Sequence, residues 1–324
     1  SVRVSHVTIG SMAIDNVDRV GSGFRLKLEV ISNVDETTSD GSTQRWFYRE
    51  ILSFRRDTDV ISPAPSDLAS LTCPSCGAAA ETDMDATCVY CGNVVNTGEF
   101  GWVVDRMHIE ERRVAPPVDT HLFPGGDEPG VNRPSIKMPN LGAAKRALSV
   151  RDASFTWGGF TQHVKHSFHV LQDAWSSLQW ERARPYETDN LFQTHRFWIE
   201  RYKADGLQNR VEGVQIEHIE ICKVDRDPYY EVITARIYAS MLDYTENTSG
   251  RVVGGNRKAR RRFSEYWTFL RRIGVTSNPD RELDGCPSCG APMSGVNAAG
   301  VCGHCHAKVV SGNFDWTLAQ IDQD

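Results

Sequence analysis

Apolar and polar residues alternate along several stretches of the chain with a period of two, which indicates β-strands that face a core on one side. The first clear stretch lies near the N-terminus, where the apolar residues Phe24, Leu26, Leu28 and Val30 alternate with Arg25, Lys27 and Glu29. The sequence Gly21-Ser22-Gly23 just before it predicts a hairpin turn. The polar residues 33–43 predict a loop that leads into the next strand. The N-terminal region is therefore expected to form a β-sheet.

The period changes to that of a helix between residues 155 and 206. Apolar residues recur at steps of three and four over Phe160–Leu178 and again over Leu191–Tyr202, which predicts two helices with an apolar face each. Gly206 is a typical helix end. Strands are expected afterwards, over residues 215–224 and 229–241, where Ile233, Ala235, Ile237, Ala239 and Met241 alternate with Thr234, Arg236 and Tyr238. The second half thus reads as two helices followed by strands.

One pattern occurs twice: a strand, two C-x-x-C pairs and a G-x-F-x-W return strand. The copies are Arg45–Arg56, Cys73-Pro74-Ser75-Cys76, Cys88-Val89-Tyr90-Cys91 and Gly98–Trp102, and then Arg261–Arg272, Cys286-Pro287-Ser288-Cys289, Cys302-Gly303-His304-Cys305 and Gly312–Trp316. Aligned on the paired arginines, Ile51 stands where the second copy has Trp267. This repeat predicts a tandem of one module.

The module boundaries follow from this pattern and from composition. We expect a first module over residues 1–112, with its zinc knuckle at 71–93, and a complete second module over 151–324, with its knuckle at 284–307. Residues 113–150 are rich in proline and glycine and predict a linker, with a short helix over 142–148. The first module lacks the helical half, so we expect the chain to be a fragment of a longer protein or another element to take that place.

Eight of the nine cysteines form the two C-x-x-C pair sets. The sets are Cys73, Cys76, Cys88 and Cys91, and Cys286, Cys289, Cys302 and Cys305, with 11 and 12 residues between their pairs. This spacing predicts two Zn²⁺ sites of four thiolates, which are closed and structural because no ligand position is left for water. His304 and His306 are further candidate ligands, although four cysteines complete each shell. Cys222 lies in a predicted strand and is expected to be a small buried apolar residue.

The net charge of −6 argues against a protein built as a whole for nucleic acid, and no apolar run reaches the length of about 18 residues that spans a membrane. Positive charge nevertheless gathers between residues 251 and 272, where eight Lys or Arg accompany one Glu. Either this cluster contacts anionic lipid or phosphate, or it is a solvated hairpin tip. The candidate contact residues are Arg251, Arg257, Lys258, Arg260, Arg261 and Arg262.

Side chains of the helical region offer weaker candidates. Trp175, Trp180, Phe192 and Trp198 either line a cavity or form ordinary core, and core is the interpretation we favour. His163, His166 and His169 repeat at steps of three, for which a solvated helix flank is favoured over a metal site. For enzyme chemistry, His218, Tyr238 and Tyr266 are candidates only if they point into a cavity, and no paired acid and base stands at an informative spacing.

Residues 155–324 resemble the family of the 44 kDa subunit of the translocase of the inner membrane, in its C-terminal domain. The resemblance rests on Tyr186-Glu187-Thr188, on Val211–Ile219, on Glu265–Arg271 and on Trp316–Ile321. It implies the cone-like fold of nuclear transport factor 2, in which helices pack into a curved antiparallel sheet. It also implies peripheral attachment to the inner face of a membrane, a scaffold role and no catalytic residues.

Together these observations predict an α+β protein of tandem cone-like modules, each with a zinc-ribbon hairpin inserted. The expected function is that of a cytoplasmic, non-enzymatic scaffold or lipid-associated subunit, within a protein assembly at a membrane, with anionic lipid as a possible ligand and no small-molecule substrate. A first alternative is an RNA- or ribosome-associated module, because a mitochondrial ribosomal protein shares this domain. A second alternative is a cone-fold enzyme with a small-molecule pocket.

Overall fold

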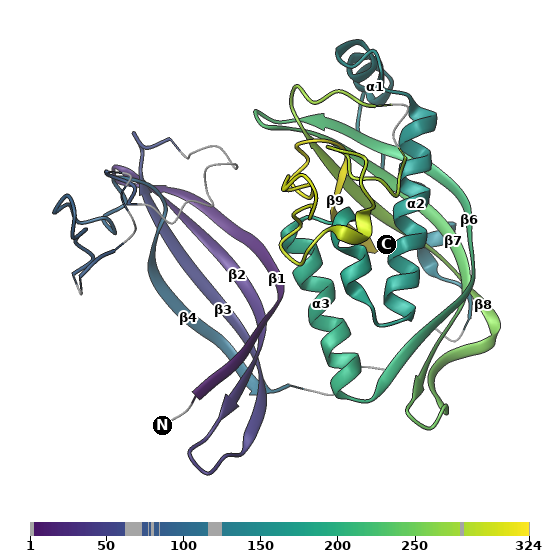
Figure 1. The fold of residues 1–324 in the computed structure, drawn as a ribbon, viewed down its shortest axis with the longest axis horizontal. Helices are drawn as coiled ribbons and strands as arrows, with labels where there is room; N and C mark the ends of the chain where they lie inside the picture. Colours follow the sequence, from purple (N-terminus) through teal and green to yellow (C-terminus); the bar gives the residue numbers. More distant parts are fainter. Residues whose placement is uncertain are drawn as a thin grey trace. The chain divides into compact units, whose positions relative to one another are not determined.

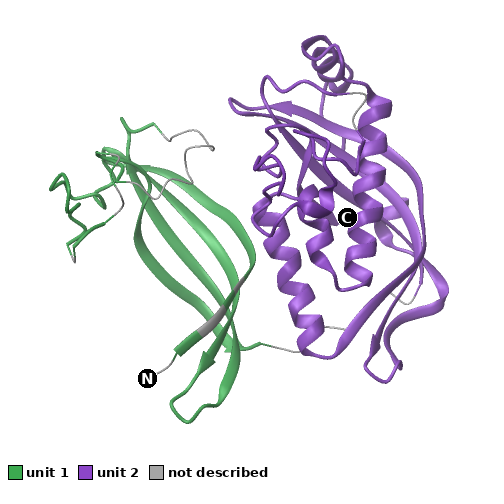
Figure 2. Cartoon of the chain, viewed as in Figure 1, with its two compact units in different colours: residues 1–116 green, residues 117–324 purple. Residues whose placement is uncertain are grey.

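The computed structural model describes residues 3–61, 73–76, 78, 81–83, 85–115, 125–278 and 282–323. The chain forms two compact units, Ser1–Pro116 and Pro117–Asp324, which are coloured separately in Figure 2. Both are built on curved antiparallel sheets, and the second adds helices, so the protein is of mixed α+β class (Figure 1). Among the described residues, no helix combines the length and hydrophobicity that crossing a bilayer requires.

The first unit is a four-stranded sheet in the order β1-β2-β3-β4. Its strands are β1 (Arg3–Val20), β2 (Gly23–Thr37), β3 (Thr43–Asp57) and β4 (Val103–Val114). The prediction of a loop over residues 33–43 was wrong, because β2 continues to Thr37 and the turn takes only residues 38–42. Polar residues extend this strand by pairing across it, as Arg45 does with Asp35 at 2.6 Å.

The second unit contains a sheet with the strand path β6-β7-β8, to which β9 is added along the free edge of β8. These strands are β6 (Leu207–Arg226), β7 (Tyr230–Asn247), β8 (Val252–Arg272) and β9 (Thr317–Gln323). A short strand, β5 (Gly126–Asp127), pairs in parallel with β8 at Arg261 and Arg262. Cys222 lies in β6 with 1% of its surface exposed, as predicted.

Helices cover one face of this second sheet (Figure 1). They are α1 (Leu141–Arg151), α2 (Trp157–Ser176) and α3 (Asp189–Ala204), with the short 3-10 helix η2 (Trp180–Tyr186). Two further 3-10 helices lie elsewhere: η1 (Pro129–Asn132) in the segment before α1, and η3 (Met293–Gly295) between the two C-x-x-C pairs of the second set. The predicted helices are thus confirmed, and α1 is longer than expected. Phe160 and Phe168 of α2 meet Phe269 and Trp267 of β8 at ring-centroid distances of 5.5 and 5.3 Å. All four side chains belong to the hydrophobic core of this unit.

The opposite face of the sheet is covered by the proline- and glycine-rich segment. Arg236 of β7, with no exposed surface, donates from its guanidinium to the carbonyls of Gly130 at 2.6 Å and Arg133 at 3.0 Å. The guanidinium also lies over the rings of Tyr238 and Tyr266 at 4.7 and 5.0 Å. Residues 125–136 therefore pack on the second unit, whereas Pro116, Pro117 and Pro124 lie outside the described residues.

The two sheets share more than strand order. Leu52 pairs with Leu28 and Met107, as Trp267 pairs with Ala235 and Ile321. Arg56 lies over the ring of Trp102 at 4.8 Å, as Arg271 lies over Trp316 at 4.5 Å. These contacts correct the sequence alignment by one residue, because Leu52, not Ile51, takes the place of Trp267. Superposing the arginine pairs 55–56 and 271–272 gives the wrong alignment, because Arg56 is the second member of its pair and Arg271 is the first member of its pair, and these two lie over the tryptophan rings.

Candidate metal centres

Each set of four cysteines gathers its sulfur atoms in one place. Within each set all four Sγ atoms lie within 4.8 Å of one another. The first and third members are buried, with 3% of Cys73, 1% of Cys88, 2% of Cys286 and 0% of Cys302 exposed. The structure thus brings together all eight cysteines that the spacing singled out.

The sulfur separations match a metal site and not a disulfide. Four pairs are 3.9–4.0 Å apart: Cys73 and Cys91, Cys76 and Cys88, Cys286 and Cys305, and Cys289 and Cys302. A disulfide needs about 2 Å between sulfurs. A tetrahedral zinc ion with Zn–S bonds of about 2.3 Å places its ligands about 3.8 Å apart. The four-thiol donor set therefore fits a closed zinc site in both units.

Backbone N–H groups of the knuckles favour the thiolate form that a metal requires. Those of Cys91 and Tyr90 lower the pKa of the Cys88 thiol to about 7. In the second set, the N–H of Ala307 and the hydroxyl of Ser288 lower the pKa of the Cys305 thiol to about 6. Hydrogen bonds to the charged form stabilise it, so the second knuckle of each set favours a thiolate. In the first knuckles, a backbone hydrogen bond is outweighed by burial and the neighbouring cysteines, which raise the pKa of Cys76 to about 11 and that of Cys289 to about 12.

The hairpins that carry the second pair of each set have the same hydrogen bonds. Asp83 Oδ1 accepts from the N–H groups of Asp85 and Thr87 at 3.0 and 2.9 Å. Asn297 Oδ1 accepts in the same way from Ala299 and Val301 at 3.0 and 3.1 Å. The bridges between Thr82 and Cys88 and between Val296 and Cys302 also correspond. Each hairpin lies between the third and fourth strands of its sheet path, β3 and β4 or β8 and β9.

The residue after a knuckle takes a left-handed backbone conformation. Gly92 and Gly290 do so with φ of 72° and 77°, whereas Gly77 lies outside the described residues. In the fourth knuckle His306 has this role, with φ of 58°, and Gly303 inside the knuckle does not have a positive φ. A side chain is strained in this conformation and glycine is not. His306 is exposed and lies beyond a complete set of four sulfurs.

We therefore expect His306→Gly to keep its zinc and to stabilise the hairpin by about 0.5–1 kcal/mol through relief of the left-handed strain. The measurement is the rate of zinc transfer to a chromogenic chelator, which should be slower than in the wild type. The matched control is His304→Gly, within the same knuckle, for which no slowing is expected. Loss of zinc from His306→Gly would instead make this histidine a ligand.

The second hairpin is fixed to the helices by Arg184 of η2, which is 2% exposed. Its Nε donates to the carbonyl of Ala298 at 2.8 Å, and its Nη1 donates to the carbonyl of Glu187 at 3.0 Å. Asp189, at the start of α3, pairs with Arg184 and also with Lys308 of the hairpin. The candidate metal site of the second unit is thus coupled to its helical layer. Sequence reasoning missed Arg184, because nothing local marks its distant partners.

The basic cluster is largely neutralised by carboxylates of its own unit. Arg262 pairs with Asp127 at 2.9 Å and with Glu217 at 2.8 Å, and Arg261 pairs with Asp243 at 2.5 Å. The remaining contacts are those of Arg261 with Glu128, of Arg257 with Glu246, and of Arg260 with the carbonyls of Gly213 and Ser240. Within the described residues, Arg251 and Lys258 alone of the six have exposed side chains without an ion pair.

The candidate enzyme residues lie on the face of the second sheet that is opposite the helices. Tyr238 lies between Ile237 and Ala239, whose side chains face the helical core, so its own side chain lies on the opposite face of β7. His218 stacks on Tyr238 with ring centroids 3.9 Å apart, and Tyr266 accepts a hydrogen bond at its hydroxyl from the N–H of Ile136. These three side chains therefore do not meet the condition set for them as enzyme candidates, which was that they point into a cavity under the helices. The alternation along β7 was the signal that could have shown this.

A cavity of about 390 Å³ lies between the helices and the sheet, where Trp175, Trp180 and Glu265 are among its lining residues. Burial raises the pKa of the Glu265 carboxyl. Next to it, His195 Nδ1 lies 2.6 Å from Oε1 of Glu187, which is fully buried. Of the other two aromatic candidates, Phe192 is buried in the core, as favoured from the sequence. Trp198 is 39% exposed, so the interpretation as core was wrong for this residue.

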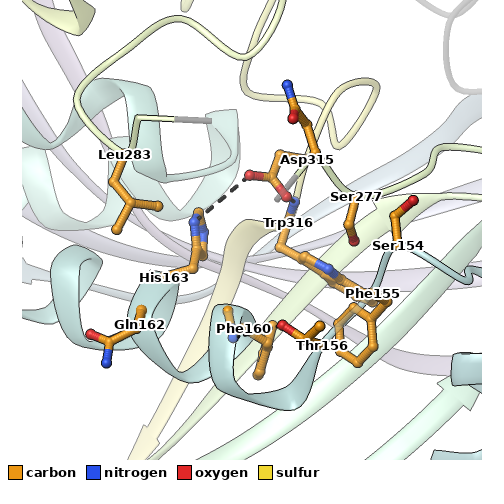
Figure 3. A pocket seen from close by; sticks show the side chains of 12 residues that line it. Ser154, Phe155, Thr156, Phe160, Gln162, His163, Ser277, Leu283, Asp315 and Trp316 are labelled. Carbon is orange, nitrogen blue, oxygen red and sulfur yellow. Dashed lines mark hydrogen bonds and ion pairs between the residues drawn. The ribbon is translucent and has the colours of Figure 1, made fainter. Parts of the chain in front are cut away.

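A second cavity of about 270 Å³ lies where the start of α2 meets the segment before β9. Figure 3 shows His163, Ser277 and Asp315 around it, with His163 Nδ1 3.8 Å from Asp315 Oδ2. The expected solvated flank of three histidines was wrong for His163, which is 6% exposed, while His166 contacts the Tyr186 hydroxyl at 3.0 Å. His169 is exposed. The three therefore form no common metal site.

Comparison with known proteins identifies one part of the chain. Residues 141–283 match the family described as the Tim44-like domain. This range begins with α1 and ends before Cys286, so both cysteine sets lie outside it. A solved structure described as an Ntf2 like protein involved in plasmid conjugation covers 98% of this chain and 78% of its own, at 6% identity and a TM-score of 0.17, which supports no argument. No curated protein matches.

Proposed function

We propose that this chain, in which residues 141–283 form a Tim44-like domain, is a non-enzymatic scaffold of two consecutive cone-like modules, each fixed by one structural zinc ion. It acts at the periphery of a membrane, on its cytoplasmic inner face, or within a larger protein assembly. The observation that carries the proposal is the pair of four-sulfur clusters, built into the same hairpin of each sheet. Closed thiolate shells leave no site for catalysis and instead stabilise a fold.

The tandem arrangement is supported by matched contacts in the two units. Strand order, the pairing of Leu52 and Trp267, and the arginine–tryptophan contacts all correspond. We place the first module at residues 1–112 and the second at 151–324. The segment between them, 113–150, is then more than a spacer, because Asp127 and Glu128 bind the arginines of β8.

The membrane location is supported by the family, whose members are peripheral to membranes, and two cations are available for anionic headgroups. Arg251 and Lys258 are exposed near the tip of the hairpin between β7 and β8. The paired residues Arg257, Arg261 and Arg262 hold the sheet together and give less support to binding of lipid or RNA phosphates. The cavity lined by Trp175, Trp180 and Glu265 favours, as a second candidate function, a small-molecule pocket.

Flotation with lipid vesicles tests the membrane proposal. The full chain is expected to float with phosphatidylcholine vesicles that contain phosphatidylglycerol and not with pure phosphatidylcholine. Each surface cation contributes about 1 kcal/mol to binding, so Arg251→Glu with Lys258→Glu should lower the partition coefficient at least about tenfold. The matched control, Arg196→Glu with Arg226→Glu, makes the same change of charge at exposed positions elsewhere.

Two results would contradict this location. Equal losses in both double variants would show a general charge effect and not a site at the hairpin tip. Absence of flotation together with salt-sensitive binding of single-stranded RNA would favour the RNA-associated alternative, because counterion release makes phosphate binding steeply dependent on salt.

A further inference from the structure

One face of the first sheet is apolar across all four strands. Cross-strand partners lie on the same face of a sheet, so the pairing register defines this surface, which we call the open face. Its three central rows are Val17–Leu26–Phe54–Val104, Ile14–Leu28–Leu52–Met107 and Met12–Val30–Glu50–Ile109. All of these residues except Glu50 are apolar.

The open face is accessible on both outer strands. Ile14 and Val17 of β1 are 63% and 53% exposed, and Val104 and Met107 of β4 are 59% and 61% exposed. The intervening positions of β2, such as Arg25 and Lys27, are polar and lie on the other face. A contiguous apolar surface on one side of a sheet marks a site of interaction.

The corresponding face of the second sheet shows what fits such a surface. There the same rows contain Ile233, Ala235, Trp267, Phe269 and Leu318, which are at most 1% exposed. The cover consists of α2 and α3, whose apolar sides belong to the same core. Figure 1 shows these helices against the sheet of β6, β7 and β8. A helical hairpin is therefore the layer that this register of strands accommodates.

Glu50 indicates which kind of partner the open face can bind. Its counterpart Glu265 accepts a hydrogen bond from the indole N–H of Trp267 at 2.9 Å, but Leu52 takes the place of that tryptophan in the first unit. Glu50 makes no hydrogen bond or ion pair with any other residue that the structure describes. A second copy of the open face would bury this carboxylate against apolar residues and another Glu50, which is costly without a partner.

We propose that the open face of the first unit binds an amphipathic helical hairpin of a partner protein. The hairpin places aromatic and aliphatic side chains on the three rows, and an N–H donor or cation against Glu50. This inference rests on the proposed scaffold function and names the chemistry of its partner. Helix-in-groove docking of this kind is a common mode of protein recognition.

The test uses the full chain and, as a probe, a fluorescent synthetic peptide of residues 157–204, the helical layer that covers the second sheet. Fluorescence anisotropy should show saturable binding, weakened at least tenfold by Met107→Asp. His108→Asp is the matched control, since this exposed neighbour lies on the opposite face and should bind as the wild type does. Circular dichroism and two zinc ions per variant establish that each is folded.

Absence of peptide binding, or equal binding by both variants, would overturn the inference. So would a concentration-dependent dimer that Met107→Asp abolishes, because the occupant would then be a second copy of the chain. Either result, obtained with the zinc content and vesicle flotation as expected, removes the helical partner while leaving the scaffold proposal intact.

Discussion

Replacement of Cys302 by serine is expected to lower the zinc content from about two ions to about one per chain and to unfold the second hairpin. Cys302 has no exposed surface, and its sulfur lies 4.0 Å from that of Cys289. Structural zinc sites contribute about 10–16 kcal/mol of binding free energy, which is folding free energy for a small metal-bound element. Elemental analysis and hydrogen exchange over residues 284–310 measure the two effects.

Cys222→Ser is the control for this variant. Cys222 is equally buried, in β6, but belongs to neither cysteine set, so this variant should keep about two zinc ions and a protected hairpin. Because Arg184 and Lys308 connect the hairpin to the helices, Cys302→Ser should also raise exchange at the start of α3. An unchanged zinc content in Cys302→Ser would contradict the assignment of the second site.

Replacement of Arg271 by methionine is expected to lower the free energy of unfolding of the second unit by about 3–5 kcal/mol. The Arg271 guanidinium is fully buried and pairs with Asp152 at 2.8 Å and with Glu231 at 2.9 Å. Burial raises the pKa of Asp152, but hydrogen bonds from Arg271 and Ser277 outweigh it and leave that pKa below its ordinary value. Methionine keeps most of the volume and leaves two buried carboxylates short of a partner. Urea unfolding followed by tryptophan fluorescence measures the loss.

The control is Arg210→Met, which removes an ion pair with Glu246 at 2.7 Å. The Arg210 side chain is 39% exposed, and Glu246 keeps Arg257 as a second partner. An exposed pair contributes about 0–1 kcal/mol, so this variant should unfold near the wild-type urea concentration. Equal losses of unfolding free energy in the two variants would show that the buried ion pairs of Arg271 stabilise the protein no more than the exposed ion pair of Arg210 does.

The local features of the chain could be predicted from its sequence. Cysteine spacing predicted the two clusters of four sulfurs because both members of each knuckle are fixed by a single turn. The helices α2 and α3 followed from their apolar period, and the strands β2 and β7 from alternation. Each of these signals is complete within about 20 residues of the chain.

The contacts between distant residues could not be predicted. Arg262 looked available for phosphate because its partners, Asp127 and Glu217, lie 135 and 45 residues away. The C-terminal end of β2 depends on polar cross-strand partners such as Arg45, which pairs with Asp35. A search for alternating apolar residues does not detect such partners. Tyr238 is the exception, since its place between two core residues already assigned it to the other face.

The most direct test of the account is the metal content of the full chain, purified under reducing conditions without chelators and measured by elemental analysis. Two closed four-thiolate sites predict about two zinc ions per chain, retained after exhaustive dialysis. A content near zero, with the eight cysteines reduced and accessible to a thiol reagent in the folded protein, would contradict it.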